Sequence, residues 1–228
     1  MEYYYTDSIF RTNTTMYNNT TKITKNNWHA HLDQIGWSKL PRNWIISMNK
    51  LSDLKEKNCR YGIYNVPGDG NCFFHCISYA LNEYLGYIEY DTSCIRKKIS
   101  DGIDDNMYET SMRYYKIMKD ANDFQEKWNP YDIKNIEEYK QIIASDNLQF
   151  LDHILLSHII DILNINIIIL NDCNIYNTLI KYDENNHSII LFYQDNIHFN
   201  LIGYFDKYMK SYFKELPSEI IKLKKNIY

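Results

Sequence analysis

The chain has 228 residues, of which 45% are hydrophobic and 24% charged, and its formal net charge is −4. This length and composition fit one soluble domain, or one domain with extensions at its ends, and argue against global disorder. The slight negative charge gives no support to nucleic-acid binding as a main role, so we expect no nucleic-acid partner.

Acidic residues are concentrated in the middle of the chain. Residues 61–203 contain 21 Asp or Glu against ten Lys or Arg, whereas both ends are mildly basic. This pattern is either ordinary solvated surface or a face suited to a basic partner.

The cysteines indicate free thiols in a reducing compartment. Their number is odd and their spacing fits no disulfide framework: Cys59, Cys72, Cys76, Cys94 and Cys173. The first 30 residues lack the pattern of a signal peptide, and no stretch is apolar enough to span a membrane. We therefore expect a cytoplasmic protein (in the host cytoplasm, if it is viral or from an intracellular bacterium) without a membrane partner.

Residues 1–57 are predicted to form an N-terminal extension. Residues 1–27 are rich in Tyr, Asn and Thr with little periodicity, which is typical of a mobile tail. Residues 28–57 have apolar residues at helical spacing, interrupted at Leu40 and Pro41, and predict two short helices.

A strand, a tight turn and a helix are predicted in succession from Tyr61. Tyr61–Val66 is the expected strand, and the turn residues of Pro67–Asn71 follow it. Apolar residues then recur at spacings of three and four, which predicts an amphipathic helix from Cys72 to Leu85.

The rest of the chain predicts helices followed by a small sheet. Residues 91–149 are expected to be mainly helical and acidic, and Ile165–Leu170 has the apolar run of a strand buried on both faces. The other expected elements are a helix at 150–163, strands at 175–182, 188–193 and 197–202, and a helical extension at 204–228 broken at Pro217. The predicted fold class is α+β, a small central sheet flanked by helices.

Cys72 is placed where a nucleophile is favoured. The unpaired N–H groups and the dipole at a helix start lower the pKa of a thiol and can stabilise an oxyanion during acyl transfer. Gly68 and Gly70 allow the preceding turn to fold tightly, so that its N–H groups, with those of Asn71, can serve as the oxyanion loop.

A base for this thiol is available on the last predicted strand. Side chains two residues apart on a strand lie on one face, so His198 and Asn200 should project together. Asn200 can hold the imidazole ring toward Cys72, as in Cys-His-Asn hydrolases.

These motifs resemble those of the ovarian-tumour (OTU) family of cysteine proteases. Gly68–Phe74 is similar to the family's nucleophile signature, and Ile197–Ile202 to its C-terminal histidine motif. The segment from Phe150 to Ile167 resembles the middle block. There the chain departs from the family pattern, because Phe150 and Leu151 replace Trp-Gly and Leu155 replaces the usual glutamate.

The resemblance covers roughly residues 61–203 and implies an OTU fold and a deubiquitinase. We expect a catalytic domain at 58–205 and a C-terminal helical extension at 206–228. The expected activity is metal-free and cofactor-free hydrolysis of the isopeptide bond after the C-terminal glycine of ubiquitin, polyubiquitin or a ubiquitin-like modifier. Cys72 is the expected nucleophile and His198 its base. Asn200 is the expected orienter of the histidine, with Asp69 as the rival, since an acid there supports the histidine in some members.

The acidic middle of the chain is the expected surface for ubiquitin, whose tail carries arginines. The candidate binding residues are Asp101, Asp104, Asp105, Asp183 and Glu184. Two alternatives stay open at this point: a catalytically silent OTU fold that binds ubiquitin, and a structural or replication-associated protein.

Overall fold

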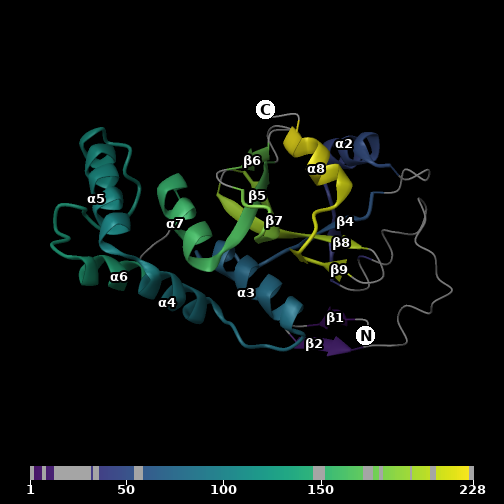
Figure 1. Cartoon of the computed structure of the whole chain (residues 1–228), viewed down its shortest axis with the longest axis horizontal. Helices are drawn as coiled ribbons and strands as arrows, with labels where there is room; N and C mark the ends of the chain where they lie inside the picture. The colour runs from purple at the N-terminus through teal and green to yellow at the C-terminus, as the bar shows by residue number, and fades with distance from the viewer. Residues whose placement is uncertain are drawn as a thin grey trace.

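A computed structural model describes most of the chain (Figure 1). The described residues are 3–6, 9–12, 32, 36–53, 59–145, 152–171, 177–179, 182–195, 197–205 and 209–225.

Within these residues, a mixed sheet forms the centre of the fold. Its strand order is β3-β4-β8-β7-β5-β6, with β9 paired to β8 and β10 to β7. Among the described strand pairs of this sheet, β5 with β7 is parallel and the others are antiparallel. The strand bounds are β3 Ser38–Lys39, β4 Tyr61–Tyr64, β5 Ile165–Asn171, β6 Asn177–Leu179, β7 His187–Gln194, β8 His198–Phe205, β9 Met209–Lys210 and β10 Tyr212–Phe213.

Both faces of the sheet are covered by helices, so its inner strands are apolar on both sides. Leu191 and Leu201 face one hydrophobic cluster, which also contains residues of α3 (Cys72–Leu85) and α7 (His153–Leu163). Ile190 and Ile202 face the other cluster, with residues of α2 (Arg42–Leu51) and α8 (Ser218–Lys225). The expectation that Ile165–Leu170 is buried on both faces is confirmed.

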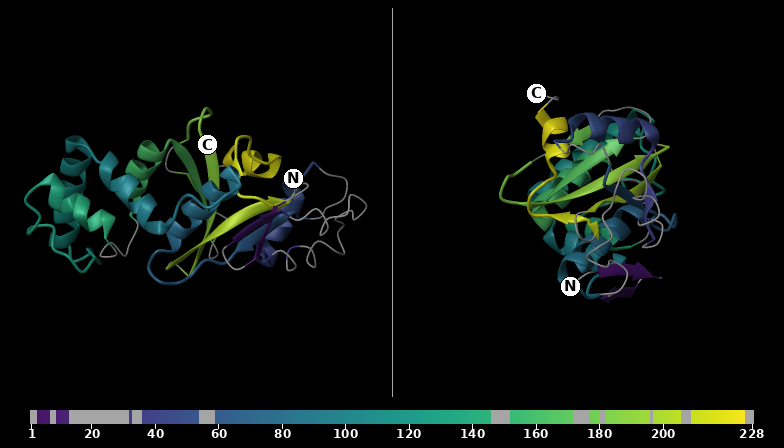
Figure 2. Two further views of the ribbon diagram at one scale, coloured as in Figure 1. Left: turned by 90° about the horizontal axis from the view of Figure 1, so that it is seen from below. Right: turned by 90° about the vertical axis from the view of Figure 1, so that its right-hand side faces the viewer.

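Three further helices form an arm at one end of the molecule, away from α2 and α8 (Figures 1 and 2). They are α4 (Thr92–Gly102), α5 (Asp105–Asp120) and α6 (Ile136–Ala144). The side chains of Asp91, Asp104 and Asn135 each accept a hydrogen bond from a backbone N–H of the first turn, which fixes the three helix starts. The α+β class is confirmed, with helices flanking a central sheet.

The C-terminal region differs from the helix expected over 204–228. Strand β8 continues to Phe205, and two short strands follow before α8 begins after Pro217. Met209 is fully buried, and Ser211 and Phe213 are also inside. Alternation of buried and half-exposed residues over 209–213 has the period of a strand, and the many Lys and Tyr residues of this segment obscured it.

The N-terminal region also contains structure where a mobile tail was expected. Strands β1 (Tyr3–Thr6) and β2 (Ile9–Thr12) pair antiparallel as a hairpin. Further along, α2 begins directly after Pro41, which accords with the predicted break and with the fixed backbone of proline. The first of the two predicted short helices falls mostly outside the described residues.

No helix within the described part of the chain is long and apolar enough to cross a membrane.

Candidate active site

Cys72 is the first residue of α3, as the sequence predicts. The turn before it has Gly70 in the left-handed region, at φ 86°, where a side chain would be strained. Within this turn the Asn71 N–H donates to Asp69 Oδ1 across 2.9 Å. Cys72 itself is a free, partly exposed thiol, so it is accessible to a substrate.

The strand that carries His198 lies directly against Cys72. The N–H of Phe199 points at Cys72 Sγ, with 3.5 Å between nitrogen and sulfur. The Phe199 ring also packs edge-on against Phe73 and stacks on Tyr193. Burial, and next the nearby thiol of Cys72, raise the pKa of Tyr193. Residues 127 positions apart are therefore brought into one site by β8 and α3.

His198 begins β8 and is partly exposed beside the nucleophile turn. A Cβ atom added at Gly68 would lie 3.9 Å from His198 Cε1, so the ring faces this turn. Among the described residues, no hydrogen bond joins His198 to Cys72. Catalytic hydrogen bonds are often long in unliganded enzymes and tighten when the substrate binds.

Asn200 is buried on β8 and connects the site to the segment that follows β4. Its Oδ1 accepts from the Val66 N–H across 3.2 Å, and its Nδ2 donates to Gln194 Oε1 across 3.4 Å. Within the described part of the chain, none of its hydrogen bonds reaches His198. Its role as the orienter of the histidine therefore stays a prediction.

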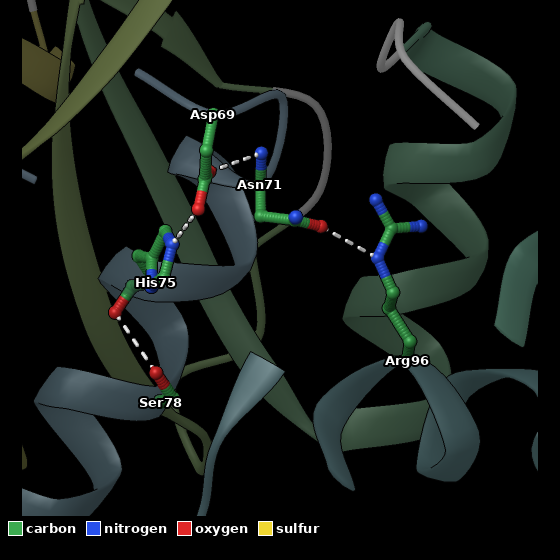
Figure 3. A network of polar contacts seen from close by, with 5 residues as sticks. All are labelled: Asp69, Asn71, His75, Ser78 and Arg96. Carbon is green, nitrogen blue, oxygen red and sulfur yellow. Dashed lines mark hydrogen bonds and ion pairs between the residues drawn. The ribbon is translucent and has the colours of Figure 1, made fainter. Parts of the chain in front are cut away.

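Asp69 is bonded within its own turn and to the nucleophile helix. Its Oδ2 lies 2.9 Å from His75 Nε2 (Figure 3). Slight burial opposes ionisation of Asp69, but hydrogen bonds from His75 and from the Asn71 N–H outweigh it, and the pKa of Asp69 is lowered. The rival role of Asp69, support of His198, likewise stays a prediction, since the described hydrogen bonds of Asp69 go to His75 and Asn71.

Two residues of this site were missed by the sequence reasoning. His75 of α3 binds Asp69. Arg96 of α4 donates from Nε to Asn71 Oδ1 across 2.8 Å (Figure 3). The three-residue spacing from Cys72 to His75 could have placed His75 at the helix start, but no sequence signal identified Arg96.

The expected ubiquitin-binding carboxylates lie on the arm and on one sheet loop. Asp101 forms an exposed ion pair with Lys97, and Asp104 caps α5 by accepting from the Met107 N–H. Asp105 is exposed in the first turn of α5. Asp183 accepts from the Asn185 N–H within a turn, and Glu184 is exposed beside it. Asp104 and Asp183 therefore hold local structure as well as charge.

We expect Asn200→Ala to lower kcat about tenfold with little change in KM, since an orienting bond matters most when the imidazolium forms. Asn200→Asp keeps an oxygen acceptor for the Val66 N–H and should retain more activity. Steady-state kinetics of both variants, with circular dichroism to verify folding, provide the measurement.

Asp69→Ala and His75→Ala provide the matched comparison. If Asp69 only stabilises its own turn through His75, the two variants should have the same small effect on kcat. A larger loss in Asp69→Ala than in both His75→Ala and Asn200→Ala would transfer the orienting role to Asp69.

No family model matches the chain, and no curated protein matches it in sequence. Among the solved structures similar to it is an ovarian-tumour domain in complex with ubiquitin, at 18% identity and a TM-score of 0.46, covering 72% of this chain and 81% of that one. The viral OTU domain protease from Dera Ghazi Khan virus is 17% identical, with a TM-score of 0.42 and coverage of 64% and 82%. The Hazara virus OTU bound to ubiquitin is 13% identical, with a TM-score of 0.41 and coverage of 64% and 83%. All three are structures of OTU domains.

Proposed function

We propose that this protein is a cysteine-type deubiquitinase in which Cys72 is the nucleophile and His198 the general base. The observation that carries this proposal is the packing of β8 on the start of α3. There the Phe199 N–H contacts Cys72 Sγ, so the residue next to Phe199 on β8, His198, comes to the nucleophile turn. A thiol, an imidazole and unpaired helix N–H groups at one place are the components that acyl transfer requires.

The reaction proceeds through an acyl-enzyme. Neutral His198 takes the proton of Cys72, and the thiolate attacks the carbonyl carbon of the last glycine of the modifier. The Asn71 N–H donates to Asp69, so the Cys72 N–H and the other N–H groups of the first turn of α3 stabilise the oxyanion. His198 protonates the leaving lysine amine as the C–N bond breaks. Water, activated by His198, then hydrolyses the thioester and restores the free thiol. No cofactor is needed for these steps.

The proposed substrate is ubiquitin, polyubiquitin or a ubiquitin-like modifier. The sequence between the nucleophile and the histidine strand is acidic. Half of its 20 Asp and Glu residues lie in the helical arm, among nine Lys or Arg, and Asp101, Asp104 and Asp105 are grouped on the exposed surface of the arm. A basic modifier tail would be attracted to such a surface, which mainly accelerates the encounter.

A catalytically silent ubiquitin-binding module is the second candidate. It is favoured by one observation: the described hydrogen bonds of Asn200 go to Val66 and Gln194, not to His198. An imidazole without an orienting partner is a less effective base, so the test must distinguish binding of ubiquitin from its cleavage.

The test uses ubiquitin with an electrophilic C-terminus, followed by a panel of linkage-defined diubiquitins and ubiquitin-like precursors. We expect a covalent adduct at Cys72, located by peptide mass spectrometry, and cleavage of at least one panel member. Binding of ubiquitin without adduct or cleavage would support the silent module. Neither binding nor adduct with any modifier would overturn both candidates.

The contribution of the arm to substrate binding can be measured separately. Asp101→Asn with Asp105→Asn removes two exposed charges and spares Asp104, which caps α5. We expect KM to rise about two- to threefold at low salt, with kcat unchanged and the difference lost at high salt, because exposed charges contribute little and are screened. Glu184→Gln is the comparison variant. A KM change for Glu184→Gln alone would move the binding surface to the sheet loop.

A further inference from the structure

Arg96 is a buried cation that connects the arm to the nucleophile turn. It lies on α4 with 1% of its surface exposed. Its Nη1 donates to the backbone carbonyls of Ser145, across 2.9 Å, and Ile143, across 3.1 Å, at the end of α6. Its guanidinium carbon lies 4.0 Å from the centre of the Phe74 ring. The planar group is thus held in place by the arm and by the first turn of α3.

A further Arg96 donor, Nε, is directed at the residue before the nucleophile. It reaches Asn71 Oδ1 across 2.8 Å, as Figure 3 shows. A charge-assisted hydrogen bond of this length, inside the protein, is stronger than a bond between neutral groups. The side chain of Asn71 therefore has a fixed orientation.

Helix α3 has no side-chain cap at its start. Asn71 occupies the N-cap position, yet its side chain accepts no bond from the first turn. Asn135 is the same residue type at the N-cap of α6, and its Oδ1 accepts from the Glu138 N–H across 2.9 Å. Asn71 differs from Asn135 in two respects: its side-chain oxygen is held by Arg96, and its backbone, at φ −109° and ψ 12°, lies outside the extended region that Asn135 occupies at φ −152° and ψ 167°.

The uncapped start of α3 can stabilise negative charge at the nucleophile. The first-turn N–H groups of α3 have no Asn71 oxygen against them, so they can stabilise negative charge on Cys72 and on an oxyanion. If Asn71 rotated back to cap α3, its carbonyl oxygen would compete for these donors.

We propose that Arg96 is a positioning residue for the nucleophile, and that it acts through Asn71 by keeping the start of α3 uncapped. Its effect on turnover rests on the proposed function, whereas its effect on thiol reactivity does not. The arm then does more than present charge to a substrate, because the end of α6 holds the cation that shapes the nucleophile turn.

The test compares Arg96→Lys, Asn71→Ala and the double variant with the wild type. An ammonium keeps the charge and some reach but cannot donate in the fixed fork geometry of a guanidinium. We expect Arg96→Lys to lower kcat roughly tenfold, below the ~10²-fold loss that follows removal of a whole oxyanion donor. KM should be unchanged. The double variant should be no slower than Arg96→Lys, because without the Asn71 side chain nothing is left to cap α3.

The matched control is Ser100→Ala. Ser100 lies on the same face of α4 one turn later and donates to the Lys140 carbonyl of α6 across 2.9 Å, without touching the nucleophile turn. Its loss weakens the packing of α4 on α6 to a similar degree, so Tm should fall in both variants, but kcat should fall only in Arg96→Lys.

Thiol reactivity provides a readout that needs no ubiquitin. The rate of Cys72 alkylation by iodoacetamide is followed against pH by peptide mass spectrometry, with the exposed Cys94 as internal reference. We expect the midpoint for Cys72 to move up by about 0.2 to 0.7 pH units in Arg96→Lys, the size of a helix-start effect, while Cys94 is unchanged.

Three results would overturn the role of Arg96. They are an unshifted Cys72 profile, a kcat equal to that of Ser100→Ala, or single-variant losses that multiply in the double variant. If Arg96→Lys does not fold, Asn71→Ala alone decides. The Cys72 alkylation profile of Asn71→Ala should stay within about 0.2 pH units of the wild type. A shift as large as a capping effect would contradict the proposal. If the wild type cleaves no modifier, the proposed function fails, and the alkylation profiles still decide the role of Arg96.

Discussion

Cys72→Ala should abolish cleavage of ubiquitin substrates, with kcat/KM lower by about 10⁴-fold or more, because a hydrolase that loses its nucleophile keeps only binding and oxyanion stabilisation. The side chain is partly exposed and small, so Tm should stay close to that of the wild type. Binding of ubiquitin should be retained. Fluorogenic ubiquitin hydrolysis, thermal unfolding and titration calorimetry measure the three quantities.

Cys76→Ala and Cys94→Ala are the controls. Cys76 is fully buried one helical turn after Cys72, and burial raises its pKa well above the usual value, so it is not a nucleophile. Its replacement should cost stability but leave the folded fraction active. Cys94 is exposed, and its replacement should change neither quantity. Turnover by Cys72→Ala near the wild-type rate would refute the nucleophile assignment.

The nucleophile turn and its helix could be predicted because their signals are local. A run of turn residues, a glycine that takes positive φ, and apolar residues at spacings of three and four fix α3 from Cys72 onward. The pairing of β8 with β7 is also short in sequence, since only residues 195–197 separate the two strands. The histidine strand was therefore placed correctly.

The partners of the site could not be predicted because they depend on tertiary packing. Arg96 opens a run with Lys97 and Lys98, and such a run usually lies in solvent. The fold instead turns Arg96 inward beside the buried Ile95 and Ile99. A sequence pattern does not show which of three adjacent cations is buried.

The hydrogen bonds of Asn200 were hidden for a similar reason. Period-two spacing places it on the same face of β8 as His198, and this face was taken to be the catalytic one. In the fold Asn200 is 2% exposed and lies beneath the chain that leaves β4. The Val66 N–H, just past the end of β4, donates to the side-chain oxygen of Asn200, and this is its one described hydrogen bond. An unpaired backbone donor created by a strand end is a tertiary feature.

Glu83, on the same helix as Cys72, should make the protein less stable as pH rises from 4.5 to about 7. It is buried, and its Oε2 accepts from Ser211 N and Ser211 Oγ across 3.0 and 3.1 Å. Burial raises its pKa to about 7, against partial compensation by the bonds from Ser211 and the charge of Lys210.

The loss of stability with rising pH follows from how Glu83 binds its proton in the folded and unfolded states. Between its ordinary pKa of 4.5 and about 7, Glu83 holds its proton in the folded state more often than in the unfolded state. Its stabilisation is therefore complete below pH 4.5 and is lost as pH rises to about 7, a difference of about 3 kcal/mol.

Glu83→Gln cannot ionise and should lack this component. Denaturant unfolding of both proteins from pH 4 to 8 measures the difference between them at each pH. Glu83 and Glu215 line one surface pocket, and Glu215→Gln, which removes an exposed carboxylate there, controls for the change in net charge. A difference in unfolding free energy between wild type and Glu83→Gln that stays constant across this range would contradict the assignment. A loss of stability with rising pH that wild type and Glu215→Gln share, and Glu83→Gln lacks, would locate a pH-sensitive contact between the nucleophile helix and the strand segment after β8.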